Sequence, residues 1–115
     1  MTQLLLHEIA YARSGDKGAN ANIGVIAYTE EGFRFLTDYL TEERVHHYFL
    51  PLGLQSTKRY LLPNLLAMNF VLLGVLGQGA STSLRIDAQG KALGQVLLQM
   101  QIEMPKELLK RCVRP

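Results

Sequence analysis

The sequence lacks several features that would each place the protein in a particular class. Its 115 residues include no tryptophan, four prolines and one cysteine, Cys112. A single cysteine excludes an intramolecular disulfide and a zinc site built from several cysteines. The net charge is only +2, and basic residues do not alternate with aromatic ones, so we expect no nucleic-acid partner.

Long hydrophobic runs are lacking as well. The longest, residues 61–77, is interrupted by Pro63, Asn64 and Asn69, and it is shorter than the roughly 20 residues that a membrane-spanning helix needs. The run at residues 4–6 is too short for the hydrophobic region of a secretory signal. We therefore expect a cytoplasmic protein without a membrane partner. A hydrophobic content of 48% is sufficient for one globular domain over residues 1–115.

The sequence does contain a distinctive polar stretch at residues 13–22, between apolar segments at residues 4–11 and 23–28. Both flanking segments are short and contain mainly strand-forming residues, so the stretch itself is predicted to be a loop. Its two glycines allow backbone N–H groups to turn toward a bound anion. The candidate ligand-binding residues are Arg13, Ser14, Gly15, Asp16, Lys17, Gly18, Asn20 and Asn22.

Two interpretations of this polar stretch remain open. Either it binds a small anionic ligand through Arg13 and Lys17, or its polar side chains only satisfy their own backbone, as Asn, Asp and Ser often do in turns. In the first case we expect Arg13, Lys17 and Ser14 to face an open pocket. Asp16 and Asn22 would then mainly hold the loop in shape.

Catalytic chemistry has weaker support in the sequence. The candidates for moving a proton are His7, in the first apolar segment, and Asp16. His46 and His47 are adjacent on an expected helix, so their side chains point roughly 100° apart and do not form a metal site. Ser14 does not stand in the Gly-x-Ser-x-Gly motif that marks a serine nucleophile. We therefore expect no metal and no cofactor.

The rest of the chain shows signals for further helices and strands. Thr29 and Thr41 each precede two glutamates, an arrangement that caps a helix and complements its dipole. Apolar residues follow each threonine at helical spacing, and Pro51 ends this helical region. Beyond it the sequence predicts a strand at residues 57–62, a loop at 77–81, a strand at 82–86 and helices at 88–101 and 106–111.

The apolar segment at residues 65–76 is ambiguous. Asn64 before it and Gly77 after it are typical of helix ends, which favours a helix that is buried on every side or forms half of a subunit interface. A strand at residues 68–73 remains the alternative, because short apolar runs occur in both structures. A small domain has little interior in which to bury every side of such an apolar helix, so we expect a homo-oligomer.

Four segments together carry a resemblance to a known family. They are residues 6–24, which contain the string Arg-Ser-Gly-Asp-Lys-Gly, and residues 62–64, 66–72 and 83–93. In this order they resemble the C-terminal domain of acyclic terpene utilisation (AtuA)-like proteins, over about residues 4–105. The resemblance implies a small ferredoxin-like domain and a link to the degradation of branched acyl compounds through CoA-dependent pathways.

The residue patterns and the resemblance agree on the fold class. Both indicate an α+β two-layer sandwich, in which helices cover one face of a mostly antiparallel sheet. They differ in element order. A ferredoxin-like domain has one strand before its first helix, whereas the residues predict two.

Two hypotheses describe the function. In the first, the chain is an accessory or ligand-binding domain without catalysis of its own, associated with CoA-linked degradation of branched or terpenoid acyl compounds. Longer family members carry a large N-terminal domain that this sequence does not contain, so a separately encoded AtuA-like large domain would be its partner. In the second, the chain is a small enzyme or acyl-CoA-processing subunit that binds a carboxylate or phosphate at residues 13–22 and transfers a proton there.

Overall fold

The structure is a computed structural model that describes residues 1–74 and 93–115. The strands in this part of the chain are β1 (Thr2–Leu5), β2 (Ala10–Lys17), β3 (Asn20–Ala27), β4 (Ser56–Leu62), β5 (Ala67–Leu73) and β6 (Gln101–Met104). The helices are α1 (Glu30–Tyr39), α2 (Glu42–Tyr48), α4 (Leu93–Leu97) and α5 (Lys106–Leu109), with short 3-10 turns η1 (Leu6–Glu8), η2 (Leu50–Leu52) and η3 (Pro63–Leu65).

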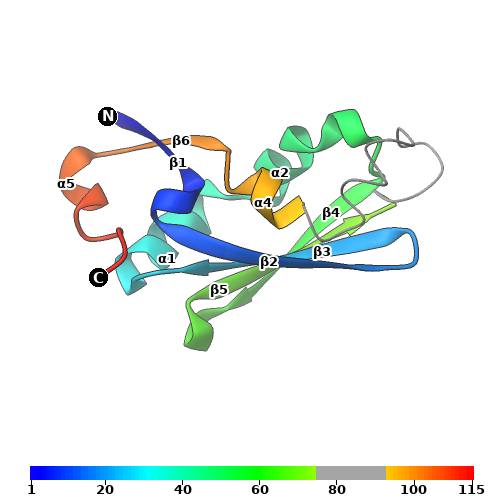
Figure 1. Cartoon of the computed structure of the whole chain (residues 1–115), viewed down its shortest axis with the longest axis horizontal. Helices are drawn as coiled ribbons and strands as arrows, with labels where there is room; N and C mark the ends of the chain where they lie inside the picture. Colours follow the sequence, from blue (N-terminus) through cyan, green and yellow to red (C-terminus); the bar gives the residue numbers. More distant parts are fainter. Residues whose placement is uncertain (75–92) are drawn as a thin grey trace.

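Four strands form one antiparallel sheet in the order β2-β3-β5-β4. It consists of two hairpins, β2–β3 and β4–β5, the second joined through η3. Strand β1 pairs with β6 in a separate two-stranded sheet. Helices α1, α2 and α4 lie on one side of the larger sheet (Figure 1). This confirms the α+β fold with helices on one face of an antiparallel sheet. Three described strands precede α1, two of them in this sheet, whereas the residues predicted two strands in all.

One hydrophobic core lies between the larger sheet and the helices. Alternate residues of the central strands point into it, among them Ile23 of β3 and Phe70 of β5, both fully buried. Leu36 of α1 meets them from the helical layer, and Ile102 of β6 belongs to the same core. Cys112 is also buried there, and burial raises the pKa of its thiol. The thiol is therefore neutral at neutral pH.

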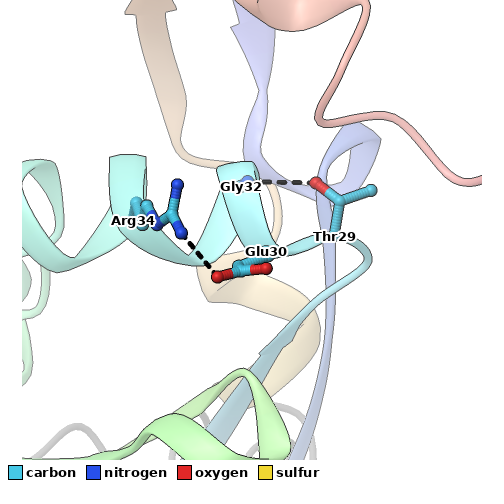
Figure 2. Close-up of polar contacts among 4 residues, drawn as sticks. All are labelled: Thr29, Glu30, Gly32 and Arg34. Carbon is cyan, nitrogen blue, oxygen red and sulfur yellow. Dashed lines mark hydrogen bonds and ion pairs between the residues drawn. The ribbon is translucent and has the colours of Figure 1, made fainter.

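Helices α1 and α2 begin where the sequence predicts. Oγ1 of Thr29 accepts a hydrogen bond from the N–H of Gly32 at 3.0 Å, and Oγ1 of Thr41 accepts one from the N–H of Arg44 at 3.1 Å. Each cap satisfies an N–H group that the first helical turn leaves unpaired. Figure 2 shows the first cap together with an ion pair between side chains one turn apart on α1.

The apolar segment at residues 65–76 does not form a helix. Strand β5 covers Ala67–Leu73, so the helix prediction is wrong and the strand alternative is confirmed. Leu66 adopts a left-handed conformation, with φ 53° and ψ 37°, where the chain turns from η3 into β5. Strand β5 is paired on both sides, and its inward face lies in the core. Its apolar composition suits a central strand as well as a buried helix, and only the pairing decides between them.

The prediction of one continuous first strand at residues 4–11 is also wrong. Turn η1 interrupts it, so that residues 2–5 pair with β6 while the chain from Ala10 onward pairs with β3. The two parts belong to different sheets. Composition did not reveal this break because the residues of η1 include Leu6, which is fully buried like a strand residue.

The predicted loop at residues 13–22 is instead the outer half of the β2–β3 hairpin. Backbone pairing continues to Lys17 and Asn20, and only Gly18 and Ala19 connect the strands. Gly18 has a φ of 62°, as a two-residue hairpin turn requires. Polar residues are tolerated in these strands because an antiparallel sheet can expose one face to water.

Later elements match the predictions in part. The strand at residues 57–62 is confirmed as β4, and the last helix is confirmed as the shorter α5. Helix α4 covers residues 93–97 of the helix predicted at 88–101, whereas β6 has no predicted counterpart. The predicted loop at 77–81 and strand at 82–86 lie outside the described residues. Within the described ranges, no helix has the length and apolar character needed to cross a membrane.

Candidate functional site

The side of the larger sheet that faces away from the helices, here called the open face, is covered by no helix of the described chain (Figure 1). Directly opposite residues on paired strands point to the same side of a sheet. Ile23 and the residue opposite it, Phe70, are both fully buried, so their row faces the core. Successive rows alternate between the two sides of a sheet, so every second row, beginning with the two neighbours of this one, belongs to the open face. Taken in the order β2, β3, β5, β4, three of these rows are Tyr11-Ile26-Ala67-Leu62, Arg13-Gly24-Asn69-Tyr60 and Gly15-Asn22-Val71-Lys58.

The open face contains a hollow of about 600 Å³, a volume within the range of small-molecule sites. Two glycines explain why the sheet is hollowed here. A Cβ placed on Gly24 would have one described atom within 4 Å, the backbone oxygen of Arg13 at 3.8 Å, and Gly15 also carries no side chain. The residues that line the hollow are Arg13, Ser14, Gly15, Asn22, Gly24, Ile26, Tyr60, Leu62, Leu65, Ala67, Met68 and Asn69.

The charge of the open face is positive. Arg13 is the one charged residue among those that line the hollow, and its side chain is exposed. Its guanidinium forms no ion pair or hydrogen bond with any other residue in the ranges 1–74 and 93–115. Lys58 adds a second exposed positive charge in the third row, and the three rows contain no acidic residue. Such a surface attracts anions.

The structure brings four of the predicted ligand-binding residues to the hollow: Arg13, Ser14, Gly15 and Asn22. Asn22, a candidate that was expected mainly to hold the loop, is among the residues that line the hollow. Ser14 was expected to face the pocket, but it lies opposite the buried Ile23, so its side chain points to the helical side and Ser14 borders the hollow with its backbone. Its Oγ accepts a hydrogen bond from the N–H of Gly94 in α4 at 3.0 Å and so joins the hairpin to the helical layer.

The other predicted residues lie away from the hollow's lining. Oδ1 of Asn20 accepts a hydrogen bond from the N–H of Gly74 at 2.8 Å, so Asn20 braces the hairpin against the end of β5. Asp16 is exposed and belongs to a row on the opposite side of the sheet from the hollow. Lys17 ends β2 and Gly18 forms the turn. The polar stretch therefore divides into residues that line the hollow and residues that shape the hairpin.

The two catalytic candidates are not brought together. His7 lies in η1, before β2 begins, whereas Asp16 lies near the far end of that strand. The seven residues from Ala10 to Asp16 alone span about 20 Å in a strand. Nδ1 of His46 lies 2.9 Å from Oγ1 of Thr57. In the part of the chain that the structure describes, no group of His, Cys, Asp or Glu side chains is arranged to hold a metal ion.

Sequence reasoning missed the residues that the second hairpin contributes. Tyr60 and Leu62 come from β4, Leu65 from η3 and Asn69 from β5. The pattern at residues 57–62 predicted a strand but not its neighbours. The helix interpretation of residues 65–76 concealed Asn69, because it offered no reason to place that side chain beside the polar stretch.

The fold and the hollow define the class of protein: a small α+β domain with a positively charged, partly apolar hollow on its open sheet face. The model of the AtuA ferredoxin-like domain family matches residues 4–103. The chain therefore belongs to this family, as its motifs suggested. No curated protein and no solved structure matches the chain.

Proposed function

We propose that this chain is an accessory, ligand-binding domain without catalytic activity of its own, and that the hollow on the open face binds a small anion. The observation that supports this proposal is Arg13, an exposed guanidinium at the hollow with no ion pair among the described residues. Arginine suits carboxylates and phosphates because its planar group donates two parallel hydrogen bonds to them.

The biological setting that we propose is the CoA-linked degradation of branched or terpenoid acyl compounds, which the sequence resemblance implies. A binding role is favoured over proton transfer because His7 lies apart from Asp16 and from the residues that line the hollow. A general acid or base must lie within hydrogen-bond reach of the reacting group.

We also propose that the domain works in an assembly, with a separately encoded AtuA-like large domain and with other copies of itself. The sequence argument for self-association depended on an apolar helix at residues 65–76, but this segment forms strand β5, so that argument no longer holds. Support now comes from β2, which lies at the edge of the larger sheet and pairs with no described strand on its outer side. Such an edge accepts an added strand. At the opposite edge, Glu42 accepts a hydrogen bond from the backbone N–H of Arg59 at 2.8 Å.

The ligand proposal is tested by replacing Arg13 and Lys17 together by alanine. We expect phosphate, sulfate or acetate to raise the melting temperature of the unchanged protein but not that of the double variant. At 100 times its dissociation constant a ligand stabilises the folded state by about 2.7 kcal/mol, which a thermal-shift measurement detects. Without ligand, the two proteins should melt at nearly the same temperature because the side chain of Arg13 is exposed and forms no ion pair or hydrogen bond with the described residues.

The matched control replaces Arg34 and Lys110 by alanine. It removes the same charge from other surfaces, where exposed ion pairs with Glu30 and Glu107 contribute little to stability. This control should still respond to anions. If anions stabilise all three proteins equally, or none of them, the hollow is not an anion site.

A further inference from the structure

The hollow has a polar end and an apolar end. The polar end consists of Arg13, Asn22 and Asn69, and the apolar end consists of Ile26, Leu62 and Leu65. Same-face rows lie about 7 Å apart along a strand, so the row of Asn22 and the row of Ile26 are about 13 Å apart. A ligand that contacts both ends must therefore be elongated and differ in polarity along its length.

The polar end favours a head group with a single negative charge. Arg13 is the one cation in the lining, and no acidic side chain opposes it there. A guanidinium binds a carboxylate through two parallel hydrogen bonds, and the side-chain amides of Asn22 and Asn69 are further donors. A head group with two negative charges would leave one of them unpaired, because Arg13 is the one cation among the lining residues.

The apolar end presents side chains that water contacts extensively. Leu65 is 65% exposed and Leu62 is 43% exposed, and both line the hollow together with Ile26, which shares a row with Leu62 across Ala67. Covering adjacent apolar side chains is favourable roughly in proportion to the area removed from water. The open space above Gly24 lies between the two ends, and its one described neighbour within 4 Å is a backbone oxygen. A linear aliphatic chain can cross there.

We propose that the hollow binds an amphipathic carboxylate, with its head at Arg13 and its aliphatic body over Gly24 toward Leu62 and Leu65. This proposal rests on the proposed function, because it specifies the class of anion that the same hollow binds. Self-association through the open face is disfavoured by comparison, since two copies would bring Arg13 and Lys58 together with no acidic residue in the three rows to oppose them.

The experiment compares octanoate, butanoate and octan-1-ol as probes of the full chain, by calorimetry and by amide chemical shifts. A fully buried methylene improves affinity about fourfold, and since the hollow is open on one side, we expect about twofold per methylene. Octanoate should therefore bind more than tenfold more tightly than butanoate, and octan-1-ol should bind weakly. The shifts should cluster at Gly24 and Asn69.

Two variants test where the head group and the aliphatic body of the ligand bind. Arg13→Met keeps the aliphatic stem and removes the charge, and should weaken octanoate binding about tenfold or more, as expected when charge-assisted hydrogen bonds are lost. Gly24→Leu fills the hollow and should abolish octanoate binding without lowering the melting temperature, because its Cβ meets no close described atom. Arg34→Met is the control and should bind octanoate as the unchanged protein does.

The outcomes separate this proposal from the proposed function. Equal affinity for butanoate and octanoate overturns the amphipathic ligand and leaves an anion site in place. Equal affinity for octanoate and octan-1-ol shows that charge is not recognised and overturns both. If Gly24→Leu retains full octanoate affinity while Arg13→Met loses it, the ligand does not cross the hollow, and the proposal fails. In the unchanged protein, amide shift changes confined to residues that do not line the hollow would also overturn the proposal.

Discussion

Arg59 shows how one side chain joins two elements of this fold. It lies in β4, and its Nη1 donates hydrogen bonds to the carbonyl oxygens of Thr37 at 2.8 Å and Leu40 at 2.9 Å, at the end of α1. The last carbonyl groups of a helix have no partner within the helix and carry partial negative charge. A positive donor from the sheet therefore both satisfies them and stabilises the helix dipole.

We expect Arg59→Met to lower the free energy of unfolding by about 1.5–3 kcal/mol, the usual contribution of hydrogen bonds from a charged donor. Urea denaturation followed by far-UV circular dichroism measures this change. Lys58→Met is the control, since Lys58 precedes Arg59 in the same strand and is exposed; its effect should stay within about 0.5 kcal/mol. Similar losses in the two variants would contradict the capping role of Arg59.

At the scale of elements, two threonines that look alike in the sequence have different roles. Thr29 and Thr41 both cap helices through their Oγ1 atoms. The hydroxyl of Thr29 also donates a hydrogen bond to the carbonyl oxygen of Arg111 at 2.7 Å. The start of α1 is therefore tied to the segment after α5, although 82 residues separate the two partners.

This difference predicts unequal costs for the same substitution. Thr41→Val removes a cap and should cost about 1 kcal/mol of unfolding free energy. Thr29→Val removes a cap and the bond to Arg111, and should cost about 1 kcal/mol more because a typical hydrogen bond adds that amount. Chemical denaturation of both variants gives the comparison. Equal costs would mean that the bond to Arg111 does not contribute to stability.

At the scale of the whole molecule, the two sheets share one core but differ in their exposed edges. Buried residues of β6, such as Ile102, belong to the same hydrophobic cluster as those of β3 and β5, so the small sheet is part of the domain and not an appendage. In the larger sheet, the edge of β4 has one N–H occupied by Glu42. The outer edge of β2 has no strand beside it among the described residues.

We therefore expect the chain to sediment as a dimer or larger oligomer at tens of micromolar, a scale on which a standard-sized interface should be occupied. Hydrogen exchange at low and high protein concentration tests the location of the contact. Amides of β2 should become more protected at high concentration, because strand addition pairs them. Amides of β4 serve as the internal control and should not change. A strict monomer at this concentration would contradict the prediction.

Local sequence signals by themselves determined the parts of this protein that depend on neighbouring residues. The caps at Thr29 and Thr41 act within three residues, and they placed the starts of α1 and α2. Polar residues at 13–22 identified a segment that contributes four residues to the hollow. The α+β class also followed from these signals, because helical and strand periodicities are read over a few turns or residues.

Only the tertiary structure decided which strands become neighbours and therefore which residues form the hollow. The same apolar residues suit a buried helix and a central strand, and β5 is a strand because β3 and β4 pair with it on both sides. The polar stretch extends a hairpin because its backbone continues the β2–β3 register, with Arg13 opposite Gly24. Asn69 reaches the same row through the pairing of β5 with β3. Pairing between strands distant in the sequence depends on register and on shared core burial, which no short segment encodes.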